Sequence, residues 1–189
     1  MNNMRANRQG FTLIELLIVV GIISLLIVVL AVAILPWLSK SEESATRTLL
    51  QQIGPVITGE KNPPTIKKFK KDAGQLSSRI SSDEKLASSQ MMLFYAAPTR
   101  STWEGSDLYK DQNYAPLLQP EDLAKFTRAE GGRLPHLVDA WEKPIWYKFD
   151  NNLKLGFVYS SGPDAMPGTP DDLIFDSRNN TVKSREEMK

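Results

Sequence analysis

The stretch that decides the fold is Arg8–Val20, which reads RQGFTLIELLIVV. It opens an apolar run, Phe11–Leu38, in which Glu15 is the only charged residue. The run has 28 residues, and about 20 apolar residues are enough to cross the hydrocarbon core of a bilayer. It therefore predicts a transmembrane helix. The alternative, a buried helix of a soluble domain, is disfavoured because such a helix carries a polar face and this run has none.

Charged residues on the two sides of the run predict its orientation. Arg5 and Arg8 precede it without any acidic residue, whereas Lys40 is followed by Glu42 and Glu43. Positively charged flanks stay in the cytoplasm. We therefore expect a single-pass protein of the inner (cytoplasmic) membrane, with its N-terminus in the cytoplasm and its head in the periplasm. A secretory signal peptide is the alternative, but its apolar region would span about 7 to 15 residues and end at a small-x-small cleavage site.

The acid inside the run calls for a partner, because a carboxylate near the bilayer interior costs several kcal/mol unless it is paired. Cleavage between Gly10 and Phe11 would create an ammonium group four residues before Glu15. In a bundle of identical helices, that ammonium group would pair with Glu15 of a neighbouring copy and fix the axial register. The alternative is that Glu15 lies in the interfacial zone without a specific partner.

The sequence GFTLIELL, residues 10–17, resembles the processing and assembly signature of type IV prepilins and type II secretion pseudopilins. In that family a short basic leader ends in Gly. A membrane aspartyl peptidase cuts after this Gly and N-methylates the new first residue, commonly Phe, and an acid occupies the fifth mature position. Gly10, Phe11 and Glu15 match. The resemblance implies a leader at 1–10, an N-terminal helix at 11–53 that is transmembrane over about 11–38, and a filament of identical subunits.

Composition leaves room for one soluble domain, an extracytoplasmic head at 54–189, because about 150 of the 189 residues lie outside the apolar run. The formal charge of +1 becomes −1 when the leader and its two arginines are removed, so nothing indicates nucleic acid as a partner. Cysteine is absent, which excludes a disulfide framework and a thiol nucleophile.

The pattern along the head predicts an α+β fold. The N-terminal helix continues as an amphipathic segment and ends at Gly54-Pro55, because proline removes a donor and disfavours helix before it. Further helices are expected over 66–80, from Ser82 to Tyr95, and from Pro120 to the glycines at 131–132. Residues 145–149 and 153–159 predict two strands of a short C-terminal antiparallel sheet, joined by the Asx-rich turn at 150–152.

Just before these strands, Asp139-Ala140-Trp141-Glu142-Lys143-Pro144 is similar to the D-x-W-G-x-P stretch that leads into the sheet of the major pseudopilin group. Asp139, Trp141 and Pro144 match, and Glu142 stands where that group has Gly. We expect Trp141 to anchor the core or the hairpin.

An acidic loop follows the strands, over 160–174, and carries three carboxylates among turn-forming residues. Calcium prefers six to eight oxygen ligands from carboxylates and from carbonyls of irregular backbone, and this loop offers both. The alternative is an ordinary Asp-rich loop whose carboxylates cap backbone amides. Spacing alone does not separate the two. The candidate carboxylates are Asp164, Asp171 and Asp172.

The segment GPDAMPGTPDD within this loop is similar to the calcium loop of the major type II secretion pseudopilin. Asp164 matches the first acid of that loop, and Asp171 and Asp172 match its adjacent pair. The resemblance further implies backbone carbonyl ligands near Ser161 and Thr169. It also implies that this chain is longer by an insertion within 58–115.

The sequence therefore predicts a structural subunit, and no enzyme, most like the major pseudopilin of a type II secretion system. Its expected partners are the prepilin peptidase, other pseudopilins, inner-membrane secretion components, further copies of the chain and membrane lipid. A type IV pilus subunit is the first alternative. A membrane-anchored extracytoplasmic enzyme is the second, and it is disfavoured because the chain has a single histidine, His136, and no Ser/His/Asp order or zinc spacing.

Overall fold

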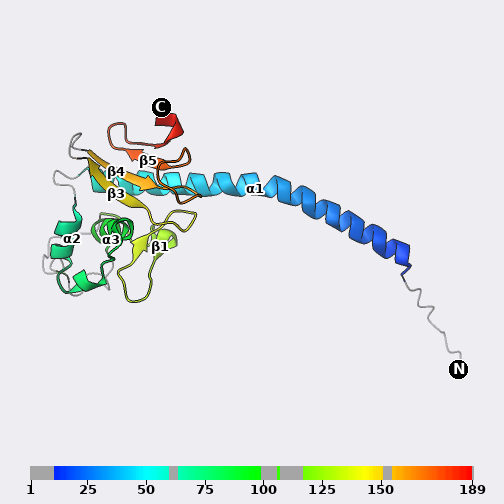
Figure 1. The fold of residues 1–189 in the computed structure, drawn as a ribbon, viewed down its shortest axis with the longest axis horizontal. Helices are drawn as coiled ribbons and strands as arrows, with labels where there is room; N and C mark the ends of the chain where they lie inside the picture. The colour runs from blue at the N-terminus through cyan, green and yellow to red at the C-terminus, as the bar shows by residue number, and fades with distance from the viewer. Residues whose placement is uncertain (1–10, 60–63, 99–105, 107–116, 151–154, 189) are drawn as a thin grey trace, which may run out of the picture. The chain divides into compact units, whose positions relative to one another are not determined.

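The computed structural model describes residues 11–59, 64–98, 106, 117–150 and 155–188, apart from the side chains of residues 35 and 36. The chain divides into two compact units, Met1–Ser41 and Glu42–Lys189. Helix α1 (Leu13–Thr58) contributes to both units. The predicted α+β class is confirmed, since a long N-terminal helix is followed by a head with shorter helices and antiparallel strands (Figure 1).

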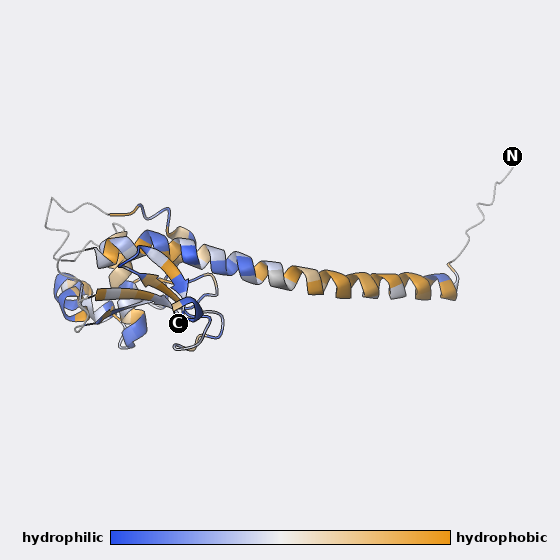
Figure 2. Ribbon diagram, turned by 90° about the horizontal axis from the view of Figure 1, so that it is seen from above, coloured by the Kyte–Doolittle hydropathy of each residue, from blue (hydrophilic) through white to orange (hydrophobic). Residues whose placement is uncertain are grey.

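The first unit contains the apolar part of α1, which is long and apolar enough to cross a membrane. Its described side chains are all exposed, and the large apolar ones range from 82% at Leu13 to 46% at Val19. Figure 2 shows this part of α1 as a nearly continuous hydrophobic ribbon that gives way to hydrophilic residues farther along the helix. No part of the described apolar segment is therefore covered by the chain itself.

The second unit begins with the amphipathic part of α1, and here the predicted end of the helix was wrong. The helix runs to Thr58 and not to residue 53. Ile53 and Ile57 are both buried, so burial of this last turn outweighs the local cost of Pro55. The carbonyl of Pro55 also accepts a hydrogen bond from the Gly59 amide at 2.9 Å.

Among the described residues, three helices come next after α1, and the last of them packs against strands of the head. Helix α2 spans Ile66–Asp72, a 3-10 helix spans Gly74–Arg79, and α3 spans Glu84–Ala96. The single helix expected over 66–80 is therefore two elements, because Gly74 has a φ of 53° and breaks the α-helical path. The predicted start of α3 is confirmed, since the Asp83 side chain caps the Leu86 amide at 2.8 Å.

The helix expected after Pro120 was also wrong. Only a 3-10 turn forms, Ala124–Phe126, and the chain then enters strand β1 (Thr127–Arg128), which pairs antiparallel with β2 (His136–Leu137). Leu123 and Phe126 are buried in the core. Anchoring these two side chains directs the backbone into β1 after less than two turns of helix.

A four-stranded antiparallel sheet closes the head, in the order β3-β4-β5-β6. The two predicted strands are confirmed, whereas their connecting turn falls mostly outside the described residues. The two last strands were not predicted. The strands are β3 (Trp146–Asp150), β4 (Leu155–Ser160), β5 (Leu173–Asp176) and β6 (Thr181–Ser184), and the 3-10 turn Glu186–Met188 follows them.

One face of this sheet packs on the C-terminal part of α1, which passes behind the strands in Figure 1. Leu50 and Ile53 from the helix share the core with Val158 and Phe175 from the sheet, and all four side chains are at most 1% exposed. Gly54 lies directly against the Phe175 ring. The missing side chain is what lets the helix approach the sheet at this point.

Buried polar side chains on α3 complete the packing. The Ser88 hydroxyl accepts the Tyr147 amide at 2.6 Å and contacts the Tyr147 carbonyl at 3.1 Å. The Ser89 hydroxyl does the same for Leu137, at 2.9 and 2.5 Å. These serines satisfy backbone groups at the edges of β3 and β2, where an unpaired buried group would be costly.

Candidate assembly segment and acidic loop

Of the two predicted processing residues, Gly10 lies outside the described residues and Phe11 is 83% exposed. Thr12 and Glu15 form a capping box at the start of α1. The Glu15 carboxylate accepts hydrogen bonds from the Thr12 amide at 2.9 Å and hydroxyl at 2.8 Å, and the Glu15 amide lies 3.3 Å from the same hydroxyl. The first turn is thereby closed by reciprocal bonds.

This geometry gives Glu15 a local function that the sequence interpretation had missed. The carboxylate satisfies an amide that has no partner within the helix and lies near the positive end of the helix dipole. Because this amide belongs to Thr12, the carboxylate is held next to Phe11. Cleavage between Gly10 and Phe11 would expose the amine of Phe11. Thr12 was not singled out, although the T-x-x-E spacing is the signal of a capping box. Pairing of Glu15 with a neighbouring copy stays a prediction.

The acidic loop leaves β4 at Ser160 and enters β5 at Leu173. Its predicted site residues differ in exposure: Asp164 is exposed, Thr169 and Asp171 are half-buried, and Ser161 and Asp172 are buried. The Asp164 carboxylate accepts the Met166 amide at 2.8 Å within its own turn. Its side chain therefore acts as the turn cap that the alternative interpretation described.

Asp172 has a different set of partners. Its carboxylate accepts the Gly168 amide at 2.7 Å and the Arg185 Nε–H at 3.0 Å, and it is 2% exposed. Arg185 was missed at the sequence level, because its approach depends on the pairing of β5 with β6.

A calcium ion would need these oxygen donors to gather around one point. Among the residues that the structure describes, no three His, Cys, Asp or Glu side chains gather where they could share a metal ion. Asp164 and Asp172 are each engaged by backbone amides, and Asp172 already has a cationic neighbour. The side chains as they lie therefore do not form the oxygen cage that calcium requires.

The turn at Asp139–Pro144 fixes the start of the acidic loop. The Asp139 carboxylate is 1% exposed and accepts the amides of Trp141 and Lys143, at 3.0 and 2.9 Å. Its other oxygen accepts the Ser160 hydroxyl at 2.6 Å. Burial raises the pKa of Asp139 above its usual value, although these hydrogen bonds oppose the shift.

Within this turn, Glu142 occupies the position where the pseudopilin pattern has Gly. Its φ is 62°, in the left-handed region that glycine adopts without strain. Arg128 from β1 binds both carboxylate oxygens of Glu142. The backbone of the turn is therefore one that favours glycine, and an ion pair from a neighbouring strand accompanies the non-glycine residue.

The enzyme alternative gains no support from the only histidine of the chain. His136 lies in β2 and is 4% exposed. Burial lowers its pKa, and the nearby arginines Arg128 and Arg133 lower it further, although Glu130 opposes them. A buried imidazole in a strand that packs on α3 is a packing residue in this arrangement.

Comparison with known proteins finds a family match for the N-terminal segment. Residues 5–34 match the family model described as "Prokaryotic N-terminal methylation motif". Searches of curated proteins and of solved structures find no match. The motif implies processing by a prepilin peptidase and assembly into pilin-like filaments, and its family is structural. Together with the long apolar helix, it indicates a membrane-anchored single-pass protein. The match over residues 5–34 thus supports a type IV pilin-like protein.

Proposed function

We propose that this chain is a structural subunit of the pseudopilus of a type II protein secretion system. The observation that carries the proposal is the N-terminal segment, which matches the methylation motif and closes its first turn through Thr12 and Glu15. The apolar side chains behind that turn are exposed within the chain. They require lipid around them before assembly and neighbouring helices after it, because apolar surface of this extent is unfavourable in water.

The turn at Asp139–Pro144 supports a pseudopilus subunit over a pilus subunit. Glu142 adopts the positive φ that a glycine in the D-x-W-G-x-P pattern would adopt. The carboxylate of Asp139 caps the amides of the same turn. We infer that the chain retains the local fold of the major pseudopilin turn. A type IV pilus subunit is the alternative function, and it predicts long surface fibres.

Orientation and processing follow from the same proposal. The leader ends at Gly10, the N-terminus faces the cytoplasm, and the head lies on the periplasmic side of the inner membrane. Cleavage after Gly10 exposes the Phe11 amine beside the carboxylate that caps the first turn. In the assembled filament, this amine pairs with Glu15 of a neighbouring subunit.

The test replaces the carboxylate. Glu15→Ala should leave membrane insertion and cleavage intact, because the helix becomes more apolar, and it should impair filament formation. The Phe11 ammonium group would remain unpaired among packed helices, and an unpaired buried charge costs about 3 to 5 kcal/mol. Glu42→Ala is the matched control, since it removes the same charge from the same helix beyond the apolar run.

Two measurements separate the possible results. N-terminal sequencing of membrane-extracted protein should give Phe11, and an intact Met1 start would contradict a pilin-like protein. Filament yield in cells should fall for Glu15→Ala and not for Glu42→Ala. Normal yield from both variants would show that Glu15 does not pair with a neighbouring subunit.

Deletion of the gene distinguishes the secretion system from the pilus, and it should stop protein export without removing surface fibres. The reverse result would establish the pilus alternative.

A further inference from the structure

We propose that Arg185 is the cation that holds the acidic loop in its folded conformation, in place of the calcium ion that the family resemblance implies. The inference concerns the loop alone and is independent of which filament the chain builds. It rests on the strand register that brings Arg185 to the loop, on the burial of Asp172, and on the separate engagement of the other carboxylates.

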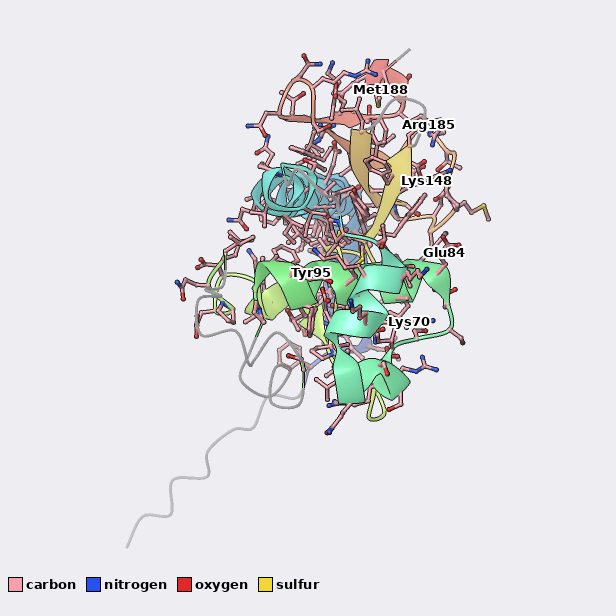
Figure 3. The ribbon with its side chains drawn as sticks, turned by 90° about the vertical axis from the view of Figure 1, so that its left-hand side faces the viewer. Lys70, Glu84, Tyr95, Lys148, Arg185 and Met188 are labelled. Atoms are coloured by element: carbon pink, nitrogen blue, oxygen red, sulfur yellow. The ribbon has the colours of Figure 1, made fainter. Side chains whose placement is uncertain are left out.

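The register of the last hairpin sets the position of Arg185. Leu173 of β5 pairs with Ser184 of β6, so the next pair along the ladder is Asp172 with Arg185. The Arg185 amide donates to the Asp172 carbonyl at 2.9 Å, and Arg185 Nε donates to the Asp172 carboxylate at 3.0 Å. Figure 3 shows Arg185 at the same end of the head as Met188, where the chain leaves β6.

The burial of Asp172 favours a cation at this position. Asp172 is 2% exposed, and an ionised carboxylate removed from water is destabilising unless it is paired. The oxygen that binds Arg185 also accepts the Gly168 amide from the far side of the loop. A single carboxylate oxygen therefore connects the loop to the end of β6, and the guanidinium group neutralises it.

The carboxylates of Asp164 and Asp171 do not join Asp172 in a calcium site. Asp164 is exposed and binds the Met166 amide within its own turn. Asp171 lies over Gly162, where a side-chain carbon would come within 2.5 Å of a carboxylate oxygen. Gly162 has a φ of 63°, so this contact also requires glycine. Calcium at Asp172 would have to displace the guanidinium group and draw two carboxylates out of their present contacts.

The experiment uses the full chain solubilised in detergent and measures hydrogen exchange in peptides that cover residues 160–174. In the wild type, exchange should be the same in chelator and in millimolar calcium. Arg185→Gln should exchange about tenfold faster or more in this segment, because the loop opens more often when Asp172 loses its cation. Arg178→Gln is the matched control, since Arg178 is exposed in the turn between β5 and β6.

Two outcomes would overturn the proposal. One is a wild-type loop whose protection collapses in chelator and returns with calcium. The other is an Arg185→Gln loop as protected as that of Arg178→Gln. Arg185→Lys adds a second comparison, because it keeps the charge and loses the Nε–H donor. Its exchange should fall between those of the wild type and Arg185→Gln. If Arg185→Gln does not fold, the wild-type comparison in chelator and calcium still decides.

Discussion

Gly54→Ala distinguishes two accounts of the same residue. If Gly54 ended the helix, as its place before Pro55 predicts, alanine would be neutral or would stabilise the head by about 0.4 to 1 kcal/mol through the unfolded state. In the structure, Gly54 lies inside α1 and is buried against Phe175, whose side chain is 1% exposed. A Cβ added at residue 54 would overlap the carbon atoms of the Phe175 ring. The ring or the helix must then move.

The expected magnitude follows from these two opposing effects. Inserting a methyl group into a packed core costs about 1 to 3 kcal/mol, and the contact with a core ring places this substitution at the upper end. Subtracting the gain of about 1 kcal/mol in helix propensity leaves a net loss of about 1 to 2 kcal/mol. For a domain of this size, the loss corresponds to a melting temperature lower by roughly 2 to 8 °C.

The assay is thermal unfolding of the head in the detergent-solubilised full chain, monitored by tryptophan fluorescence. Gly21→Ala is the control, because a Cβ at Gly21 would meet no atom within 4 Å. Gly54→Ala combined with Phe175→Leu should cost less than the two single changes together, since the smaller side chain leaves space for the methyl group. A Gly54→Ala head that melts at or above the wild-type temperature would refute the close approach.

The remaining predictions concern the cap and the turn. Thr12→Val should weaken the first turn by about 0.5 to 2 kcal/mol and speed amide exchange there, whereas Thr12→Ser should retain the cap; equal exchange in both would contradict the capping box. Asp139 should give the head an unusual pH dependence. Burial raises the pKa of Asp139 in the folded head above its ordinary value of 3.8, so protonation of Asp139 stabilises the folded state. This stabilisation is fully present below about pH 3.8 and is lost as the pH rises through the pKa of the folded state. Melting of the wild type and of the Asp139→Asn variant at a series of pH values checks this, and the wild type should lose stability relative to the variant as the pH rises.

The parts of the fold that could be predicted are those that local pattern determines. The apolar run from Phe11 leaves one secondary structure possible over its whole length, and α1 confirms it. Strands were predicted over 145–149 and 153–159 because aromatic and alternating apolar residues favour strands, and the structure has them at Trp146–Asp150 and Leu155–Ser160. The end of α1 could not be predicted, because burial of Ile57 against distant parts of the chain decides it.

The last hairpin shows a different limit. Strand β5 begins with Leu173 and Ile174, which were included in the predicted acidic loop, and Thr181–Ser184 reads TVKS, which carries only one apolar residue. Neither segment shows the alternation that predicts a strand. Their pairing becomes evident only when the first of them is placed beside β4. Thr12, by contrast, was predictable, because its signal lies within four residues of sequence.

The acidic loop combines both situations, and this explains why its cation was assigned differently from sequence and from structure. Asp164, Asp171 and Asp172 are close in sequence, so a local pattern identifies the negative charge and a divalent ion is the natural partner to consider. Arg185 becomes a neighbour only through the β5–β6 register, which is a tertiary feature. A register shifted by one residue would turn its side chain to the opposite face of the sheet. In this chain the residue that stands opposite the buried acid is Arg185, and hydrogen exchange in chelator and in calcium decides between it and a divalent ion.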